Sequence, residues 1–115
     1  MVKIKIKPLS INEAYRGRRF ATPKLKAYKE MLGYLFPKKP TKKISKREKL
    51  QVKYVFGVSS KGGDFDNLVK CFQDCLAEHY GFNDNQIYRA EIEKKIVEKE
   101  QEYIEFEIAQ LQDLN

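Results

Sequence analysis

Residues 50–80 read LQVKYVFGVSSKGGDFDNLVKCFQDCLAEHY, and this stretch predicts a strand, a turn and a helix in immediate succession. Apolar side chains occupy alternate positions across residues 50–58, which is the pattern of a β-strand with one buried face. Residues 59–63 contain two serines and two glycines and therefore favour a turn. From Asp66, a suitable N-cap residue, apolar side chains recur at helical spacing until Gly81, a typical residue after a helix C-terminus.

Further elements are predicted before this central unit. In residues 2–6, branched apolar side chains alternate with lysines, which indicates a half-buried strand that stops at Pro8. Thr22 and Pro23 form a favourable helix N-terminus, and apolar residues follow at helical spacing until Pro37. The sequence therefore predicts one strand and one helix on the N-terminal side of the central strand.

The last third of the chain is ambiguous between a long helix and two strands. Its apolar residues partly fit a helix rich in Glu and Lys, but residues 88–96 and 104–108 also alternate. The helical pattern fails at Lys99 and Glu100, where the apolar stripe should continue. We therefore favour a β-hairpin that turns near residues 98–102.

The size and composition of the chain fit one compact domain. With 115 residues and 42% hydrophobic content, the chain can bury a single core. The predicted fold class is α+β: residues 1–115 form one domain, a small mixed β-sheet packed by two helices in the approximate order β-α-β-α-β-β. No apolar run approaches the roughly 18 residues that a membrane span needs. The charged N-terminus is also unlike a secretory signal, so a soluble, unexported protein is expected.

Positive and negative charges are separated along the chain. Residues 1–63 contain 18 Lys and Arg but 3 Asp and Glu, whereas residues 64–115 contain 5 and 13. The most basic segment, residues 38–49, predicts an exposed loop near phosphate or a loop that only improves solubility. The basic half would attract a polyanion, and divalent cations held by some of the acids would offset the repulsion from the other half. A basic nucleic-acid binder with an ordinary solvated acidic tail explains the charge pattern equally well.

Acidic residues gather where the helix after the central strand begins. Asp64 and Asp66 are two residues apart, so in an extended chain their carboxylates point to the same side and can share a divalent cation. On a helical wheel, Lys70 and Asp74 lie on the face of Asp66, opposite the apolar stripe. Asp84, in the loop after the helix, offers a third carboxylate. Each acid also has an ordinary structural explanation as a helix cap or a turn residue, and Lys70 has one as the partner of Asp66 in a simple helix ion pair.

Cys71, Cys75 and His79 lie four residues apart on the apolar stripe of the same helix. Their spacing raises the question of a zinc site, but a fourth ligand of suitable spacing is missing, and buried packing is the better interpretation. Two cysteines within one helix also cannot build a disulfide framework, which is compatible with a reducing compartment.

Three stretches together resemble the RusA-type Holliday junction resolvases, including their phage and prophage relatives. Residues 64–70 (DFDNLVK), followed by Asp74, resemble the family block DxDNxxKxxxDxL. Residues 83–87 (NDNQI) resemble its downstream Asp-x-Gln-Ile/Val block, and residues 10–16 (SINEAYR) resemble its N-terminal stretch. The combined order and spacing are more specific than any one of these motifs.

The resemblance implies a crossover junction endodeoxyribonuclease that depends on Mg²⁺, with Mn²⁺ as a substitute, and that resolves four-way junction DNA by symmetric cuts in recombination and repair. It implies catalytic metal ligands at Asp64, Asp66 and Asp84 and a catalytic Lys70. Asp74, on the same helix face, is expected either to support these ligands from behind or to be a helix-face partner of Lys70. It also implies a homodimer in the cytoplasm of a bacterial host, with no membrane partner. A homodimer is expected on mechanistic grounds as well, because two symmetric nicks require two active sites.

Two positions depart from the family pattern. Asn83 stands where some relatives have a second acid, and Gly62 and Gly63 stand where others have arginines. Because of the first departure, Asp84 is the acid of its block, and the missing second acid would weaken metal affinity or change metal preference. Because of the second departure, we expect phosphate contact near the glycine turn to come from Lys61 or from residues 38–49.

The predicted DNA-binding residues combine amide, aromatic and cationic groups, which suit contacts with phosphates and splayed bases. They are Asn12, Tyr15, Arg16, Arg18 and Arg19 in one glycine-containing loop, together with Lys61. Two other functions remain open from the sequence. One is a non-catalytic basic DNA-binding protein, and the other is a metal nuclease that acts on other branched nucleic acid, such as flaps, or on RNA.

Overall fold

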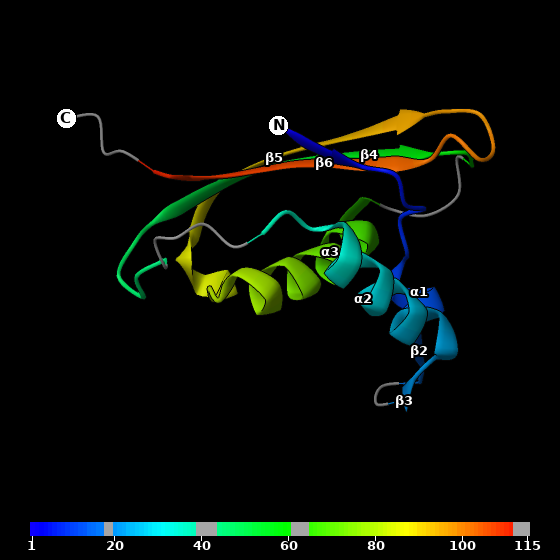
Figure 1. Ribbon diagram of the computed structural model, residues 1–115, viewed down its shortest axis with the longest axis horizontal. Helices are drawn as coiled ribbons and strands as arrows, with labels where there is room; N and C mark the ends of the chain where they lie inside the picture. The colour runs from blue at the N-terminus through cyan, green and yellow to red at the C-terminus, as the bar shows by residue number, and fades with distance from the viewer. Residues whose placement is uncertain (18–19, 39–43, 61–64, 112–115) are drawn as a thin grey trace.

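The protein forms a β-sheet layer with helices against one of its faces, in a computed structural model that describes residues 1–17, 20–38, 44–60 and 65–111 (Figure 1). The four-stranded sheet has the order β1-β6-β4-β5. Its strands are β1 (Val2–Ile4), β4 (Leu50–Val58), β5 (Ile87–Ile96) and β6 (Tyr103–Gln110). The mixed sheet and its helical layer confirm the predicted α+β fold class.

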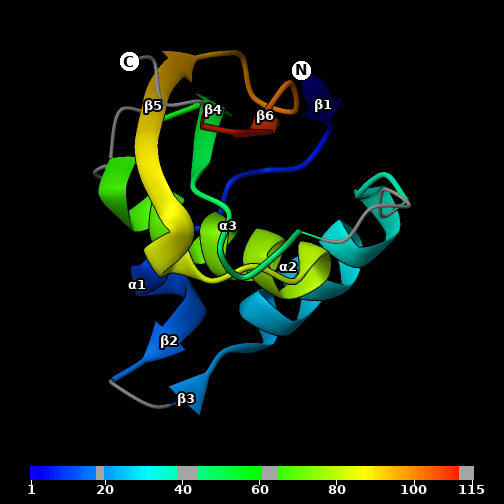
Figure 2. The same cartoon turned by 90° about the vertical axis from the view of Figure 1, so that its left-hand side faces the viewer.

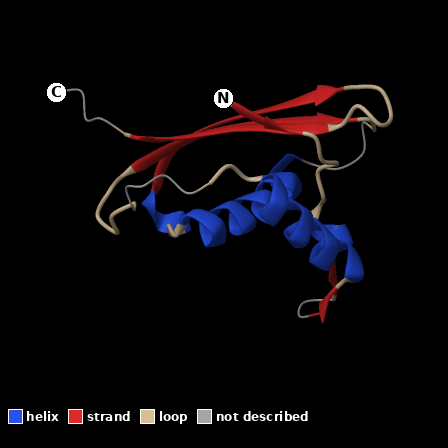
Figure 3. Cartoon of the chain, viewed as in Figure 1, coloured by secondary structure: helices blue, strands red, loops and turns tan. Residues whose placement is uncertain are grey.

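The helices lie on the same side of the sheet, as Figures 2 and 3 show. They are α1 (Ile11–Ala14), α2 (Pro23–Leu35), α3 (Phe65–Tyr80) and the short 3-10 helix η1 (Asp84–Gln86). A small hairpin of β2 (Tyr15–Arg16) and β3 (Phe20–Ala21) joins α1 to α2. Among the described residues, no helix is both long and apolar enough to cross a membrane.

The predicted N-terminus of α2 is confirmed in detail. Thr22 is the N-cap, its side chain accepts a hydrogen bond from the backbone N–H of Leu25, and Pro23 opens the helix. The segment before it was expected to be a loop, but it contains the single turn of α1 and the hairpin β2-β3. Gly17 at the hairpin turn has a φ of 63°, a conformation that glycine adopts without steric cost.

The predicted C-terminal hairpin is wrong in its pairing, although both strands and the turn region are present. β5 and β6 do not pair with each other, because β4 lies between them, parallel to β5 and antiparallel to β6. Helix α3 returns the chain to one edge of β4, so β5 runs parallel to it, as in a βαβ unit. Residues 97–102 then pass the end of β4, where the Val97 N–H donates to the Val58 carbonyl at 2.7 Å. Crossing two strand spacings, about 9.6 Å, requires this longer connection rather than a tight turn.

Aromatic rings fill the core between the sheet and α3. Phe72 of α3 is fully buried, and its ring centroid lies 5.3 Å from that of Tyr54 and 5.9 Å from that of Phe56, both in edge-on geometry. Phe36, just after α2, and Phe106 of β6 also contact Phe72, with centroid distances of 6.0 and 5.8 Å. One α3 side chain therefore connects α2, β4 and β6 in a single core.

The face of the sheet away from the helices carries mainly charged side chains. Val52, Tyr54 and Phe56 of β4 are buried under the helices, so the residues between them and their register partners occupy the opposite face. On that face Lys53 forms an ion pair with Glu91 at 3.4 Å. The acids of this face are Glu91, Glu93, Glu105 and Glu107, and its basic residues are Lys3, Lys53, Arg89 and Lys95. Part of the acidic half of the sequence is therefore a solvated sheet surface.

We expect Gly57→Ala to lower the free energy of unfolding by about 1–3 kcal/mol, because overpacking has costs of that size. Gly57 of β4 is the register partner of Tyr103, and an added Cβ would overlap the Tyr103 ring. Lys3 lies over the same ring, with its Nζ 4.2 Å from the centroid, which leaves the ring little freedom to move aside. Urea denaturation measures the effect. In a Tyr103→Ala background the same substitution is expected to cost almost nothing, and equal costs in both backgrounds would contradict this explanation.

Candidate active site

Helix α3 and the turn after it bring charged groups from two separate sequence blocks together. The Lys70 Nζ lies 2.9 Å from Asp74 Oδ1 on the next turn of α3 and 3.5 Å from Asp84 Oδ2 at the start of η1. The predicted meeting of the helix face with the loop acid is therefore present for these three residues. All three side chains remain about half exposed, at 58%, 42% and 43%, so solvent and a ligand can reach them.

The two carboxylates keep Lys70 in its charged form. The hydrogen bond from Lys70 to Asp74 is the largest influence that raises the pKa of the ammonium group, with further contributions from Asp84, while partial burial opposes them. Because the group is largely exposed, water screens these pairs, and they contribute about 0–1 kcal/mol each to stability. The two ion pairs therefore hold the Lys70 ammonium group in position and add little to the stability of the fold.

The other oxygen of the Asp84 carboxylate, Oδ1, accepts a hydrogen bond from an amide side chain. Gln73 Nε2 donates to Asp84 Oδ1 at 3.3 Å, and the buried Tyr54 hydroxyl donates to Gln73 Oε1 at 3.0 Å. Burial and, to a smaller extent, the charge of Asp84 raise the pKa of Tyr54, so its hydroxyl keeps its proton and remains a donor. Neither residue was predicted to take part in the site. The only sequence signal was a tyrosine at a buried strand position and an amide on the polar face of α3.

The turn that carries Asp84 is fixed by its neighbours. The Asn83 side chain accepts a hydrogen bond from the Asn85 N–H at 3.1 Å, and Gln86 Oε1 accepts from the Asn83 N–H at 2.9 Å. The buried Gln86 amide also donates to the carbonyls of Ser45 and Glu48, at 2.9 and 3.1 Å. Asn83, which departs from the family pattern, is thus the cap of this capping box.

Asp66 lies in the first turn of α3 with an exposed side chain. The prediction that it is the N-cap is wrong by a small margin, since α3 begins at Phe65 and Asp66 is already inside the helix. Its Oδ1 accepts from the Asn67 N–H at 3.0 Å. In the described part of the chain the ion pairs of Lys70 are with Asp74 and Asp84, so the alternative of a simple Asp66–Lys70 helix pair is not supported.

The predicted three-carboxylate metal site is only partly within the described residues. Asp64, which completes it, lies outside them. The described ranges contain no group of three or more His, Cys, Asp or Glu side chains that could hold a metal ion. Asp66 and Asp84 nevertheless present exposed carboxylate oxygens, the ligand type that Mg²⁺ prefers. The donor set fits this ion, and the complete site remains a prediction.

Cys71 and Cys75 pack in the core, as expected from their place on the apolar stripe. Burial raises the pKa of the Cys71 thiol to about 12 and that of Cys75 to about 11. Thiols with such values stay protonated near neutral pH, whereas metal ligation requires thiolates. The ring of His79 lies against those of Phe36 and Tyr80, with centroid distances of 4.9 and 4.8 Å. These contacts favour packing over zinc binding.

The predicted DNA-binding residues are divided between described and undescribed parts of the chain. Asn12 is exposed on α1, Tyr15 is half-buried in β2, and the backbone of Arg16 also belongs to β2. Arg18, Arg19 and Lys61 lie outside the described residues. Helix α1 contacts α3, so the Asn12 segment belongs to the same helical layer as Lys70.

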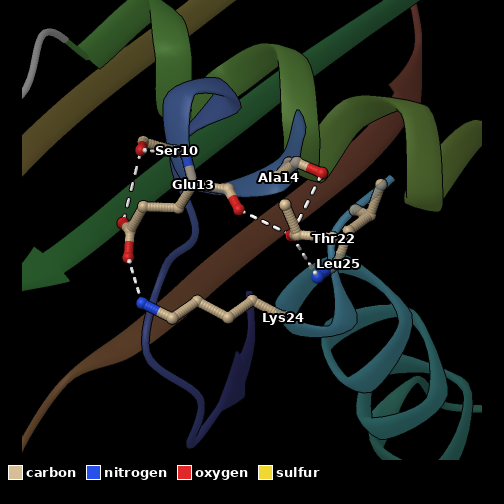
Figure 4. A network of polar contacts seen from close by, with 6 residues as sticks. All are labelled: Ser10, Glu13, Ala14, Thr22, Lys24 and Leu25. Carbon is tan, nitrogen blue, oxygen red and sulfur yellow. Dashed lines mark hydrogen bonds and ion pairs between the residues drawn. The ribbon is translucent and has the colours of Figure 1, made fainter. Parts of the chain in front are cut away.

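A polar network that the sequence did not indicate anchors the base of the β2-β3 hairpin (Figure 4). The Thr22 hydroxyl lies 2.7 Å from the Glu13 carbonyl, to which it donates, and 3.2 Å from that of Ala14. The Thr22 N–H donates to the Ala14 carbonyl at 2.9 Å. The Glu13 carboxylate accepts from Ser10 at 3.3 Å and pairs with Lys24 at 3.4 Å. Both ends of the hairpin are thereby attached to α1 and α2.

Comparison with known proteins agrees with the resemblance seen in the motifs. A search of the curated proteins finds no match to the chain. The family model described as endodeoxyribonuclease RusA matches residues 9–109, which include α1, α3, η1 and nearly all of β6. The match thus includes the Lys70 and Asp84 that the fold brings together. This chain is therefore a member of the RusA endodeoxyribonuclease family.

Proposed function

We propose that the protein resolves four-way DNA junctions by symmetric, Mg²⁺-dependent hydrolysis of phosphodiester bonds, in recombination and repair. The observation that carries the proposal is the contact of Lys70 with Asp84, which unites two acidic blocks 14 residues apart on one accessible surface. Membership of an endodeoxyribonuclease family supports DNA as the substrate. The metal ligands in this proposal are Asp64, Asp66 and Asp84.

A divalent cation held by these carboxylates supplies two things when bound: a water of lowered pKa and a positive partner for a nonbridging phosphate oxygen. The protein groups have distinct tasks around it. Lys70, kept charged by Asp74 and Asp84, is placed to stabilise the negative charge that develops on the phosphate. Asp74 orients Lys70 through the 2.9 Å hydrogen bond. Asn12, Tyr15, Arg16, Arg18, Arg19 and Lys61 would bind the DNA.

Binding through the helical layer follows from the location of the proposed site. Lys70 and Asp84 meet on α3 and the turn after it, and α1 contacts α3, so the DNA is expected to approach the side of α1 and α3. Because each chain supplies a single site and two symmetric cuts are required, the active form is expected to be a homodimer on one junction.

Cleavage of matched substrates tests the proposal. A four-way junction, a flap and a linear duplex of the same sequences are incubated with the protein in Mg²⁺, in Mn²⁺ and in EDTA. We expect symmetric cuts in the junction with either metal, an intact linear duplex and no cleavage in EDTA. Preference for the flap would assign a different nuclease substrate, and binding without cleavage of any branched DNA would favour the non-catalytic alternative.

A further inference from the structure

The carboxylate of Asp84 is shared between two donors of different kinds. Lys70 contacts Oδ2 at 3.5 Å, while Gln73 Nε2 donates to Oδ1 at 3.3 Å. Gln73 in turn is held by the Tyr54 hydroxyl at 3.0 Å. We propose that Gln73, oriented by the buried Tyr54, is a positioning residue that aims Asp84 at the metal. This inference rests on the proposed function, in which Asp84 is a metal ligand.

The orientation of the Gln73 amide follows from hydrogen-bond chemistry. A tyrosine hydroxyl has one proton to donate, and the side chain of Tyr54 is fully buried, so an unpaired hydroxyl there would be costly. When Tyr54 donates to the oxygen end of the amide, the NH₂ end is directed to Asp84. A core residue of β4 thus fixes the direction of a donor at the half-exposed site.

A neutral donor has an advantage in this position. Unlike the Lys70 ammonium group, which pairs with Oδ2, the amide limits the rotation of the Asp84 carboxylate without adding a positive charge beside it. Partners of this kind, which orient ligands, typically change metal affinity by about 10–100-fold when they are removed. Leucine or methionine at position 73 would fill similar space but could not donate a hydrogen bond.

The test combines metal binding and cleavage in the whole protein. Gln73→Met is compared with wild type by calorimetric titration of Mn²⁺ without DNA and by the Mg²⁺ concentration that gives half-maximal junction cleavage. We expect Mn²⁺ affinity to fall about 10–100-fold and the required Mg²⁺ to rise similarly, with the cleavage rate largely recovered at saturating Mg²⁺. Gln51→Met on the opposite sheet face is the matched control and is expected to behave as wild type, and urea unfolding verifies that each variant is folded.

A double-mutant cycle tests the part assigned to Tyr54. Tyr54→Phe is expected to weaken Mn²⁺ binding in the wild-type background and to have no further effect when Gln73→Met is already present, because Tyr54 acts through Gln73. Equal effects in both backgrounds would show that Tyr54 acts on the fold instead. Unchanged metal affinity in Gln73→Met, together with lost binding in Asp84→Asn, would overturn the inference but leave the proposed function standing. Unchanged binding and cleavage in Asp84→Asn would overturn the proposed function itself.

Discussion

Replacing Asp84 with asparagine is expected to reduce junction cleavage about 10³-fold while leaving junction binding intact or slightly tighter. Metal coordination contributes several kcal/mol of transition-state stabilisation, and a loss of about 4 kcal/mol corresponds to about 10³-fold in rate. Binding should survive because the substitution removes a negative charge from a site that faces phosphate. Asp66→Asn is expected to behave in the same way, whereas a DNA-binding protein without catalysis would show no rate to lose.

The measurements are single-turnover cleavage in saturating Mg²⁺ and gel-shift binding to the same junction in EDTA. Glu78→Gln supplies the control, because it makes the same type of charge change at an exposed position of α3 that carries no proposed role. Its cleavage rate is expected to match that of the wild type. If Asp84→Asn and Glu78→Gln cut junctions equally fast, Asp84 is not part of the active site.

Phe72→Ala is expected to have the largest effect on stability. Its ring is fully buried and contacts four other aromatic rings, so the cavity left by its removal cannot close easily. Large-to-small substitutions of this kind cost about 3–5 kcal/mol. Since domains have a total stability of about 5–15 kcal/mol, a substantial unfolded fraction is expected near physiological temperature.

Urea and thermal denaturation followed by circular dichroism measure this loss. Phe65→Ala is the matched control on the same helix, because Phe65 is 54% exposed. Its effect is expected to stay within about 0.5 kcal/mol, as is usual for surface positions. Similar losses in both variants would mean that Phe72 is not the centre of the core.

Strands and helices with strong local patterns could be predicted from the sequence, but the pairing of the strands could not. The alternation in residues 50–58 predicted β4 with the bounds that the structure has, and the cap at Thr22 predicted the start of α2. The pairing of β5 and β6 failed because alternation specifies a strand but not its neighbour. That choice depends on the crossover through α3, which delivers β5 to one edge of β4 and leaves the other edge for β6.

The candidate active site could likewise be predicted only in part. Helical spacing indicated that Lys70 and Asp74 share one face of α3, and the family block indicated Asp84 in the loop after this helix. They did not indicate the hydrogen bonds of Tyr54 and Gln73, which come from different elements and meet only in the folded chain. The predicted contributions of Asp64, Arg18, Arg19 and Lys61 fall outside the described residues and stay predictions.

The charged face of the sheet that lies away from the helices has a consequence for how the protein meets DNA. Glu91, Glu93, Glu105 and Glu107 share this face with Lys3, Lys53, Arg89 and Lys95, so acidic and basic residues balance there. Neighbouring charges of opposite sign cancel each other's field within a short distance into solvent. This face is therefore expected neither to attract nor to repel a nucleic acid strongly, and the guidance of an approaching duplex is left to the rest of the molecular surface.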